Sequence, residues 1–191
     1  MLLEAGGELR FRFDERRAVQ AAAVLLREAG GTENYTSILK ELYLADRQSL
    51  IETGQPITGS TFVSMANGPV LSEVYNCIKG EVEVADSLWD HCIRTQGYNV
   101  ELVEDPGDDQ LSDYDVGVLT DLAKKYKRVS YTHLIDVVHG LPEWKHPKPA
   151  KVAPLPAADI LRAVGENDEA ISDRAKRAKY LAAVDRLIHS S

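Results

Sequence analysis

The most informative stretch of this sequence is Ile38-Leu39-Lys40-Glu41-Leu42-Tyr43-Leu44-Ala45-Asp46-Arg47-Gln48-Ser49-Leu50-Ile51. Most of its apolar residues fall on one side of a helix, but Leu44 and Ile51 lie off that side. The pattern therefore predicts a central helix with more than one face covered by protein. Gly54 and Pro56 follow it, and their backbone preferences predict that the helix stops there and the chain reverses.

Upstream, two further elements are expected. Leu9-Arg10-Phe11-Arg12-Phe13 alternates apolar and basic residues, which predicts a short strand with one buried face. Asp14 is a suitable cap for a helix from Glu15 to Ala29, which Gly30-Gly31 would end. Either Thr32 or Asn34 could cap the central helix that follows.

Downstream of the central helix, residues 61–66 resemble a strand in composition. Gly68-Pro69 is expected to break it and to begin a helix from about Val70 to Ile78, closed by Gly80. Residues 91–95 and 98–103 flank Gln96-Gly97, which fits a tight antiparallel hairpin with glycine in its turn.

The second half of the chain is expected to be mostly helical. Ser112 with Asp115 resembles a capping box for a helix to Tyr126, and Ser130 or Thr132 can start a short helix that ends at Gly140. Five of the eight prolines then fall between residues 142 and 156. This segment is either laid over the body or a linker, and Trp144 favours the first interpretation.

Two C-terminal helices complete the expected organisation, at residues 157–164 and 168–188. The packing face of the longer helix is predicted to comprise Ile171, Ala175, Ala178, Leu181, Ala182, Leu187 and Ile188. The predicted fold class is mainly α (α+β), a compact helical domain with a small antiparallel β-sheet or hairpin. Residues 1–145 would form the main domain, and residues 146–191 a proline-rich connection with C-terminal helices that pack on it.

Composition limits the classes of partner. The formal net charge is −8 and the pI near 5.1, which argues against nonspecific binding to nucleic acid or to anionic membranes. The longest mainly apolar run, residues 21–26, is too short to span a membrane. With two cysteines and no secretory leader, a cytoplasmic protein is expected.

Residues that could bind a metal or carry catalysis are few and scattered: Cys77, His91, Cys92, His133, Asp136, His139 and His146. Their spacings match neither a helical ligand pair nor a cysteine knuckle, so no metal site is expected. No nucleophile elbow or phosphate-binding glycine loop is present. We therefore expect no cofactor and no enzymatic activity.

Asp46 and Arg47 at the end of the central helix allow two interpretations. They could contact a partner, or they could form an internal ion pair that orients the turn at Gly54, and the sequence favours the structural role. The corner Gly68-Pro69-Val70 is likewise expected to be a fold element first. Tyr75 is expected in the core with its hydroxyl at the edge.

Several of these short motifs occur together in one order: Leu42-Tyr43-Leu44-Ala45-Asp46-Arg47, Gly54-Gln55-Pro56-Ile57-Thr58-Gly59, Asn67-Gly68-Pro69-Val70 and Glu73-Val74-Tyr75. In this combination the chain resembles the SocA-like antitoxin family, also called the Panacea domain. The resemblance covers roughly residues 15–145. Its motif residues are expected to be mainly structural, and they comprise Tyr43, Ala45, Gly54, Pro56, Gly68, Pro69 and Val70.

The resemblance implies a mainly helical, non-enzymatic antitoxin of bacteria, phages or mobile elements. Such a protein would neutralise a cognate protein toxin by direct binding, or act as a proteolytic adaptor that delivers the toxin to a Clp-type protease. An acidic antitoxin suits a basic toxin. A DNA-binding transcriptional regulator is the alternative, followed by a small hydrolase that uses His133 or His139.

Within this resemblance, the residues expected to contact the toxin are Asp46, Arg47, Tyr75 and Trp144. Asp46 and Arg47 lie near the turn, whereas the two aromatic residues could act as anchors in an interface. The acidic loop at residues 104–109 is expected to steer a cationic partner toward this protein.

Overall fold

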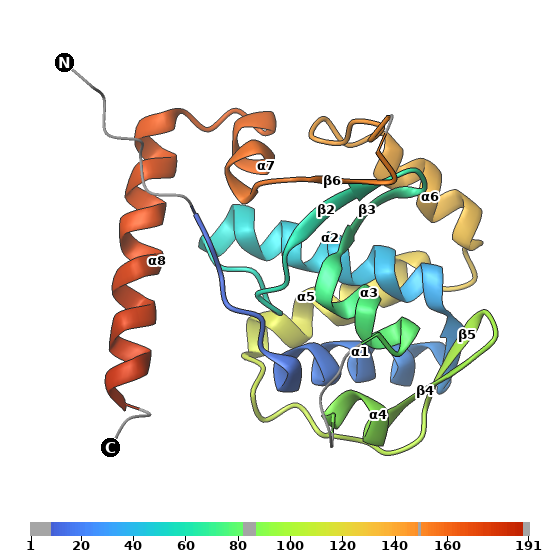
Figure 1. The fold of residues 1–191 in the computed structure, drawn as a ribbon. Coiled ribbons are helices and arrows are strands. Elements are labelled where there is room, and N and C mark those ends of the chain that lie inside the picture. The colour runs from blue at the N-terminus through green and yellow to red at the C-terminus, as the bar shows by residue number, and fades with distance from the viewer. Residues whose placement is uncertain (1–8, 82–86, 149, 189–191) are drawn as a thin grey trace.

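The computed structural model describes residues 9–81, 87–148 and 150–188, and within these ranges it contains eight helices and six short strands. Helix α2 (Tyr35–Thr53) runs through the middle of the molecule. Figure 1 shows α1 (Glu15–Ala29) and α5 (Asp113–Tyr126) on one side of α2, and β2 (Phe62–Met65), β3 (Gly68–Leu71) and β6 (Val152–Pro154) on the other. The predicted mainly helical α+β class is confirmed.

The central helix owes its position to its caps and to its burial. The Asn34 side chain accepts a hydrogen bond from the Thr36 N–H at 2.9 Å, and Gly54 ends the helix in the left-handed region. Every residue from Ser37 to Asp46 is buried. The prediction that protein covers more than one face of this helix is therefore confirmed, because ten consecutive residues span all sides of it.

The N-terminal region follows the prediction in part. Asp14 caps α1 by accepting from the Arg17 N–H, and Gly30 ends the helix. The strand expected at residues 9–13 is wrong, because this extended segment belongs to neither sheet. Its alternation is nevertheless real, since Leu9 is buried and Arg10 exposed. Alternation requires only an extended chain on a surface, and no neighbouring strand pairs with this one.

One three-stranded antiparallel sheet has the order β1 (Thr32–Asn34), β5 (Asn99–Leu102), β4 (Ile93–Gln96). It contains the predicted hairpin, but the turn lies one residue later than expected, at Gly97-Tyr98, with Gly97 at φ +61°. The first strand also starts later than expected because a short helix, α4 (Leu88–Cys92), precedes it. The shift places Tyr98 at the tip of the hairpin instead of in a strand.

The second three-stranded sheet has the order β3 (Gly68–Leu71), β2 (Phe62–Met65), β6 (Val152–Pro154). β2 agrees with the predicted strand. The helix expected from about Val70 to Ile78 is confirmed as α3 (Ser72–Lys79), which Gly80 ends, but it starts two residues late because Gly68–Leu71 return as β3. Pro69 is tolerated here because β3 is an edge strand, whose outer side needs no donor.

Two further helices agree closely with their sequence signals. Ser112 and Asp115 form the predicted capping box at the start of α5. Of the two candidate starts for α6 (Tyr131–His139), Ser130 is the cap, and Gly140 follows the last helical residue. Both starts depend on hydrogen bonds within four residues, which is why the local sequence predicts them.

The proline-rich segment lies over the body, as Trp144 indicated. The Trp144 Nε1–H donates to the Met65 carbonyl at 3.3 Å, and the Leu155 N–H donates to the Phe62 carbonyl at 3.1 Å. Between them, β6 joins the second sheet. The domain boundary expected at residue 145 stays a prediction.

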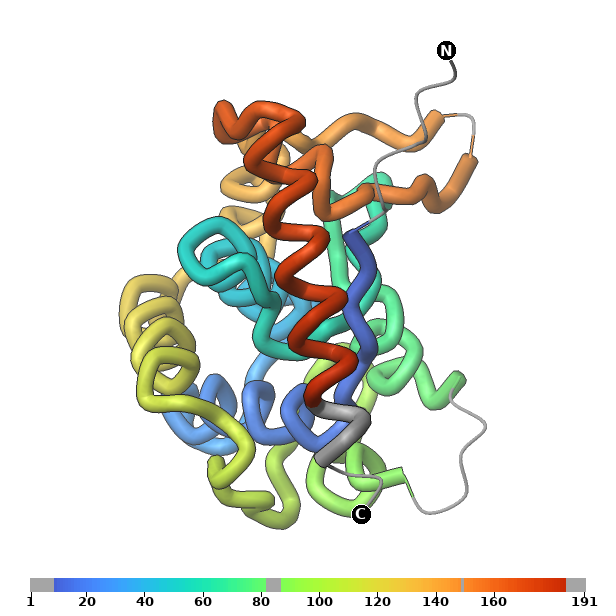
Figure 2. Tube along the Cα trace, turned by 90° about the vertical axis from the view of Figure 1, so that its left-hand side faces the viewer, coloured from blue at the N-terminus to red at the C-terminus, as the bar shows by residue number. Residues whose placement is uncertain are grey.

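Helices α7 (Ala157–Ala163) and α8 (Asp168–Ile188) follow. In both Figure 1 and Figure 2, α8 runs beside the N-terminal segment. Ile171, Ala175 and Ala178 are buried, as predicted. Leu181 and Ala182 are exposed, so the predicted packing face is wrong beyond Ala178, and the side chains of Leu187 and Ile188 lie outside the described residues. No helix in the described ranges has the length and apolarity needed to cross a membrane.

Candidate functional site

Arg47 and Tyr43 of α2 meet the carboxylate of Glu143. Arg47 donates from Nε to Oε1 at 2.6 Å and from Nη2 to Oε2 at 3.1 Å, and the Tyr43 hydroxyl donates to Oε1 at 2.9 Å. The Glu143 side chain is fully buried and that of Arg47 is 16% exposed. Burial and the adjacent carboxylate raise the pKa of Tyr43 above its usual range. This triad ties the segment after α6 to the central helix.

Asp46 is fully buried and does not pair with Arg47. Its carboxylate accepts from the Thr58 N–H at 3.0 Å and from the Thr58 hydroxyl at 2.6 Å. Burial raises the pKa of Asp46 to about 7, although the hydrogen bonds from Thr58 oppose this rise. Asp46 and Arg47 therefore do not form the expected ion pair with each other, and each makes its own contacts inside the protein. Asp46 has no exposed surface that a partner could contact.

A second carboxylate orders the chain between α2 and α3. Glu73 accepts from the Ser60 hydroxyl at 2.7 Å, and from the N–H and hydroxyl of Thr61 at 2.7 and 2.8 Å. Burial alone would raise the pKa of Glu73, but these hydrogen bonds outweigh it and hold the pKa below its usual value. Glu73 thus fixes the start of β2 against the start of α3.

The family-motif residues predicted to be structural lie inside the protein. Gly68 has φ +95°, and a Cβ placed on it would lie 2.5 Å from Cγ2 of Val138. Lys40 Nζ donates to the Pro69 carbonyl at 2.9 Å, and burial lowers the pKa of Lys40 to about 7. The remaining motif residues are also buried, and they are Tyr43, Ala45, Gly54, Pro56, Pro69 and Val70.

Trp144, expected as an aromatic anchor, is used internally. Its ring stacks on that of His139 with centroids 3.9 Å apart and planes at 14°, and its N–H is bound to Met65. The residue is only partly exposed. His139 is half-buried, while His133 is exposed at the start of α6.

The acidic loop at 104–109 lies against α1 and is largely paired there. Asp105 and Asp108 face Arg27 at 2.6 and 3.6 Å, and Asp109 faces Arg16 at 3.3 Å. Arg27 and Arg16 therefore offset part of the negative charge that was expected to steer a cationic partner toward this loop. The loop serves as a brace for α1, while its role in steering stays a prediction.

Three tyrosines lie around the β4–β5 hairpin, of which Tyr98 is exposed while Tyr35 and Tyr75 are half-buried. We name Tyr35, Tyr75, Lys79 and Tyr98 the tyrosine surface. The Tyr98 side chain is 76% exposed and stacks on Tyr35 with ring centroids 6.2 Å apart and planes at 16°. Lys79 Nζ lies 4.2 Å from the centroid of Tyr35 and 5.6 Å from that of Tyr75. Figure 1 shows this hairpin projecting from the body.

The tyrosine surface contains one of the four predicted contact residues, Tyr75, which is half-buried. Sequence reasoning missed Tyr35, Lys79 and Tyr98. Tyr98 was missed because the hairpin turn was placed one residue too early, which put it inside a strand. Gly97 with a large aromatic residue next to it was the signal that could have located the tip.

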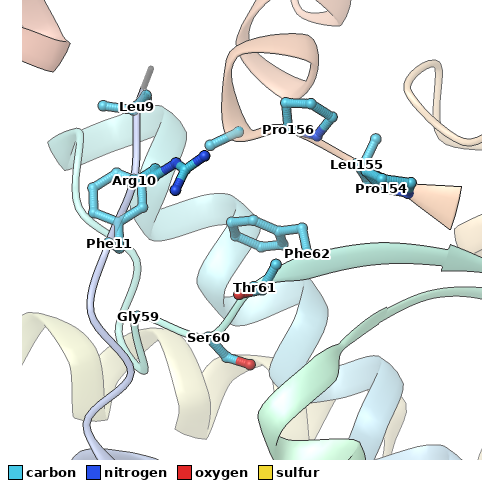
Figure 3. A pocket seen from close by; sticks show the side chains of 11 residues that line it. Leu9, Arg10, Phe11, Gly59, Ser60, Thr61, Phe62, Pro154, Leu155 and Pro156 are labelled. Atoms are coloured by element: carbon cyan, nitrogen blue, oxygen red, sulfur yellow. The ribbon is translucent and has the colours of Figure 1, made fainter. Parts of the chain in front are cut away.

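A separate pocket of about 390 Å³ lies between the N-terminal segment, the start of β2 and the start of α7. Figure 3 shows Arg10 and Phe11 on one side of it, Phe62 on another and Pro156 on a third. Its lining is mixed, with Arg10, Ser60 and Thr61 among apolar residues. In the described part of the chain, no group of three or more His, Cys, Asp or Glu residues is arranged to hold a metal ion.

These features define a compact α+β domain built on a buried central helix, with three tyrosines around one projecting hairpin. The family described as "Antitoxin SocA-like, Panacea domain" matches residues 38–145, more than half of the chain. This protein therefore belongs to the SocA-like antitoxin family. No curated protein and no solved structure matches the chain.

Proposed function

We propose that this protein is a cytoplasmic antitoxin that neutralises a cognate protein toxin by binding it directly through the tyrosine surface, without catalysis. Family membership supports the antitoxin role. We choose this surface because Tyr98 is a large aromatic residue that is 76% exposed and is held in place by stacking on Tyr35. Tyrosine is enriched among the residues that dominate binding energy in interfaces.

The chemistry of this surface favours a basic toxin. The exposed face of a tyrosine ring attracts a lysine or arginine side chain. Glu33 of β1, Glu81 after α3 and Glu101 of β5 belong to the elements around the tyrosines. The net charge of −8 would accelerate encounter with a cationic partner.

Growth rescue tests the proposal and separates it from the adaptor mechanism. The toxin candidate is the adjacent reading frame, expressed from a tight promoter with and without this protein, in cells that contain or lack Clp protease. Rescue in both backgrounds supports direct neutralisation. Rescue only with the protease present would replace it by a Clp-dependent adaptor, and unchanged toxicity in both would contradict an antitoxin role for that gene pair.

Tyr98→Ser should abolish rescue or weaken toxin binding by about tenfold or more, because a central aromatic anchor contributes about 2 kcal/mol. Tyr180→Ser is the matched control, since Tyr180 of α8 is also highly exposed, at 69%, but lies outside the tyrosine surface. The control should leave rescue and affinity unchanged. Equal effects of the two substitutions would contradict the proposed surface.

A further inference from the structure

A larger hollow lies on another face of the protein, between residues 142–148 and helix α7. Its volume is about 630 Å³ and its floor includes Ser64 of β2 and Leu155. Small-molecule sites in proteins commonly occupy about 300–1,000 Å³. The hollow shares no residue with the tyrosine surface, so we treat it as separate and name it the lysine groove.

The charges that line the lysine groove are mainly positive. Lys145, His146 and Lys148 line one wall, and residues 144–151 contain no acidic side chain. The two lining carboxylates are already committed, since Glu143 pairs with Arg47 and Asp159 pairs with Arg162. Within the described residues, neither Lys145 nor Lys148 forms an ion pair. This groove wall therefore carries a local excess of cations on a protein of net charge −8.

The wall that carries these lysines is held in place. Glu143 is anchored by Arg47 and Tyr43, and Trp144 is fixed by its stack on His139 and its hydrogen bond to Met65. If the lysines were simply solvated side chains on a loose loop, that would account for the positive charge but for nothing else. They would not explain a hollow of ligand size beneath a segment that is anchored on the core.

We propose that the lysine groove binds a small anion that carries adjacent phosphate groups. Lys145 and Lys148 supply ammonium donors, which bind phosphate as point charges. Arg162 is already shared between Asp159 and Asp168, at 2.8 and 2.9 Å, so the lysines are the principal charged donors.

Titration calorimetry of the full chain with tripolyphosphate and with ATP at low salt tests this site. Both probes share adjacent phosphates, and tighter binding of ATP would identify a nucleotide, whereas equal affinities would identify the phosphate chain as the ligand. The double variant Lys145→Gln/Lys148→Gln should weaken binding by about tenfold. Circular dichroism checks that the variant is folded.

Lys124→Gln/Lys127→Gln is the matched control. It removes the same charge from exposed positions at the end of α5, outside the groove, and should leave the affinity unchanged. Absence of binding by both probes would overturn the proposal. An equal loss in the groove and control variants would also overturn it, because the effect would then reflect overall charge and not a site.

Discussion

Glu143 lies about 100 residues beyond Tyr43 along the chain, yet its carboxylate is satisfied almost entirely by Tyr43 and Arg47. A buried ion pair is weak evidence for stability as such, but breaking one leaves an uncompensated charge inside the protein. At residue scale, removing only one charged member of the triad should therefore destabilise the fold, because the other charge stays inside the protein without a partner. The triad joins α2 to the segment that carries Trp144 and the lysine groove.

Glu143→Gln should lower the free energy of unfolding by about 3 kcal/mol, since it leaves the largely buried Arg47 without its counter-charge. Urea denaturation measures this change. The double variant Arg47→Met/Glu143→Gln should be more stable than Glu143→Gln alone, because it removes the unpaired guanidinium. A double variant that is no more stable than Glu143→Gln would contradict this explanation.

Gly68→Ala should destabilise the protein by about 3 kcal/mol or more, because the new methyl group meets Val138 while the backbone stays at φ +95°. Gly97→Ala is the control. Gly97 also has positive φ, at +61°, but no atom lies within 4 Å of its added Cβ, so about 1 kcal/mol is expected. Thermal unfolding of both variants distinguishes steric overlap from backbone strain, and equal losses would exclude overlap as the main cause.

Roles that depend on local backbone preferences could be predicted from the sequence, whereas contacts between residues far apart in the chain could not. Gly68 and Pro69 were identified as fold elements because glycine and proline carry backbone preferences that act locally. Glu143 was not paired with Arg47, since no local pattern records a contact over 96 residues. Tyr98 illustrates how a turn shifted by one residue changes a strand position into an exposed tip.

At the scale of elements, α8 is attached to α2 by one arginine, while Ile171, Ala175 and Ala178 join the hydrophobic core. Arg174 donates to the Leu50 and Ile51 carbonyls at 3.4 and 3.0 Å, at the C-terminal end of α2, where the helix dipole favours a cation. The same guanidinium pairs with Glu166 at 2.6 Å. Leu181 and Ala182 of the predicted packing face are exposed, so among the described side chains the buried ones of this face lie in the first half of α8.

Arg174→Gln should loosen α8 by about 1–2 kcal/mol, because two carbonyls and Glu166 lose a charged donor. The readout is the rate of limited proteolysis within α8, together with hydrogen exchange of its amides. Lys176→Gln is the control on the same helix, since Lys176 pairs only with Asp173 on an exposed face. Similar rates in wild type, variant and control would show that packing alone holds the helix.

Elements whose signals are local were predicted well. The caps at Asp14, Ser112 and Ser130 each accept a hydrogen bond from a neighbour within three residues, and all were identified. The strand expected at residues 9–13 is wrong and strand β3 was not predicted, because both depend on which strand lies alongside. Pairing partners are tertiary information that periodicity does not contain.

On the scale of the whole molecule, α2 concentrates buried titratable groups in the core. Burial lowers the pKa of Lys40 to about 7, and burial with the nearby charge of Glu33 raises the pKa of Glu41 to about 8. Burial also raises the pKa of Asp46 to about 7. All three groups therefore change charge near neutral pH in the folded state, unlike their counterparts in an unfolded chain.

The sign of each contribution follows from proton binding in the two states. Between pH 4.5 and about 8 the unfolded chain loses the Glu41 proton while the folded protein keeps it, so stability falls as pH rises. Asp46 acts in the same direction between pH 3.8 and about 7. Lys40 acts oppositely, since between about pH 7 and 10.5 only the unfolded chain stays protonated. These groups together place a stability minimum near pH 7–8.

Glu41→Gln isolates one contribution, because a glutamine resembles the protonated acid at every pH. The variant and wild type should have similar free energies of unfolding below pH 4.5, where Glu41 is protonated in both states. Above this pH the variant should become progressively more stable than wild type, by about 2–4 kcal/mol at pH 8. Urea denaturation across this range measures the difference. A difference that does not change with pH would show that the Glu41 carboxyl is not held protonated by the core.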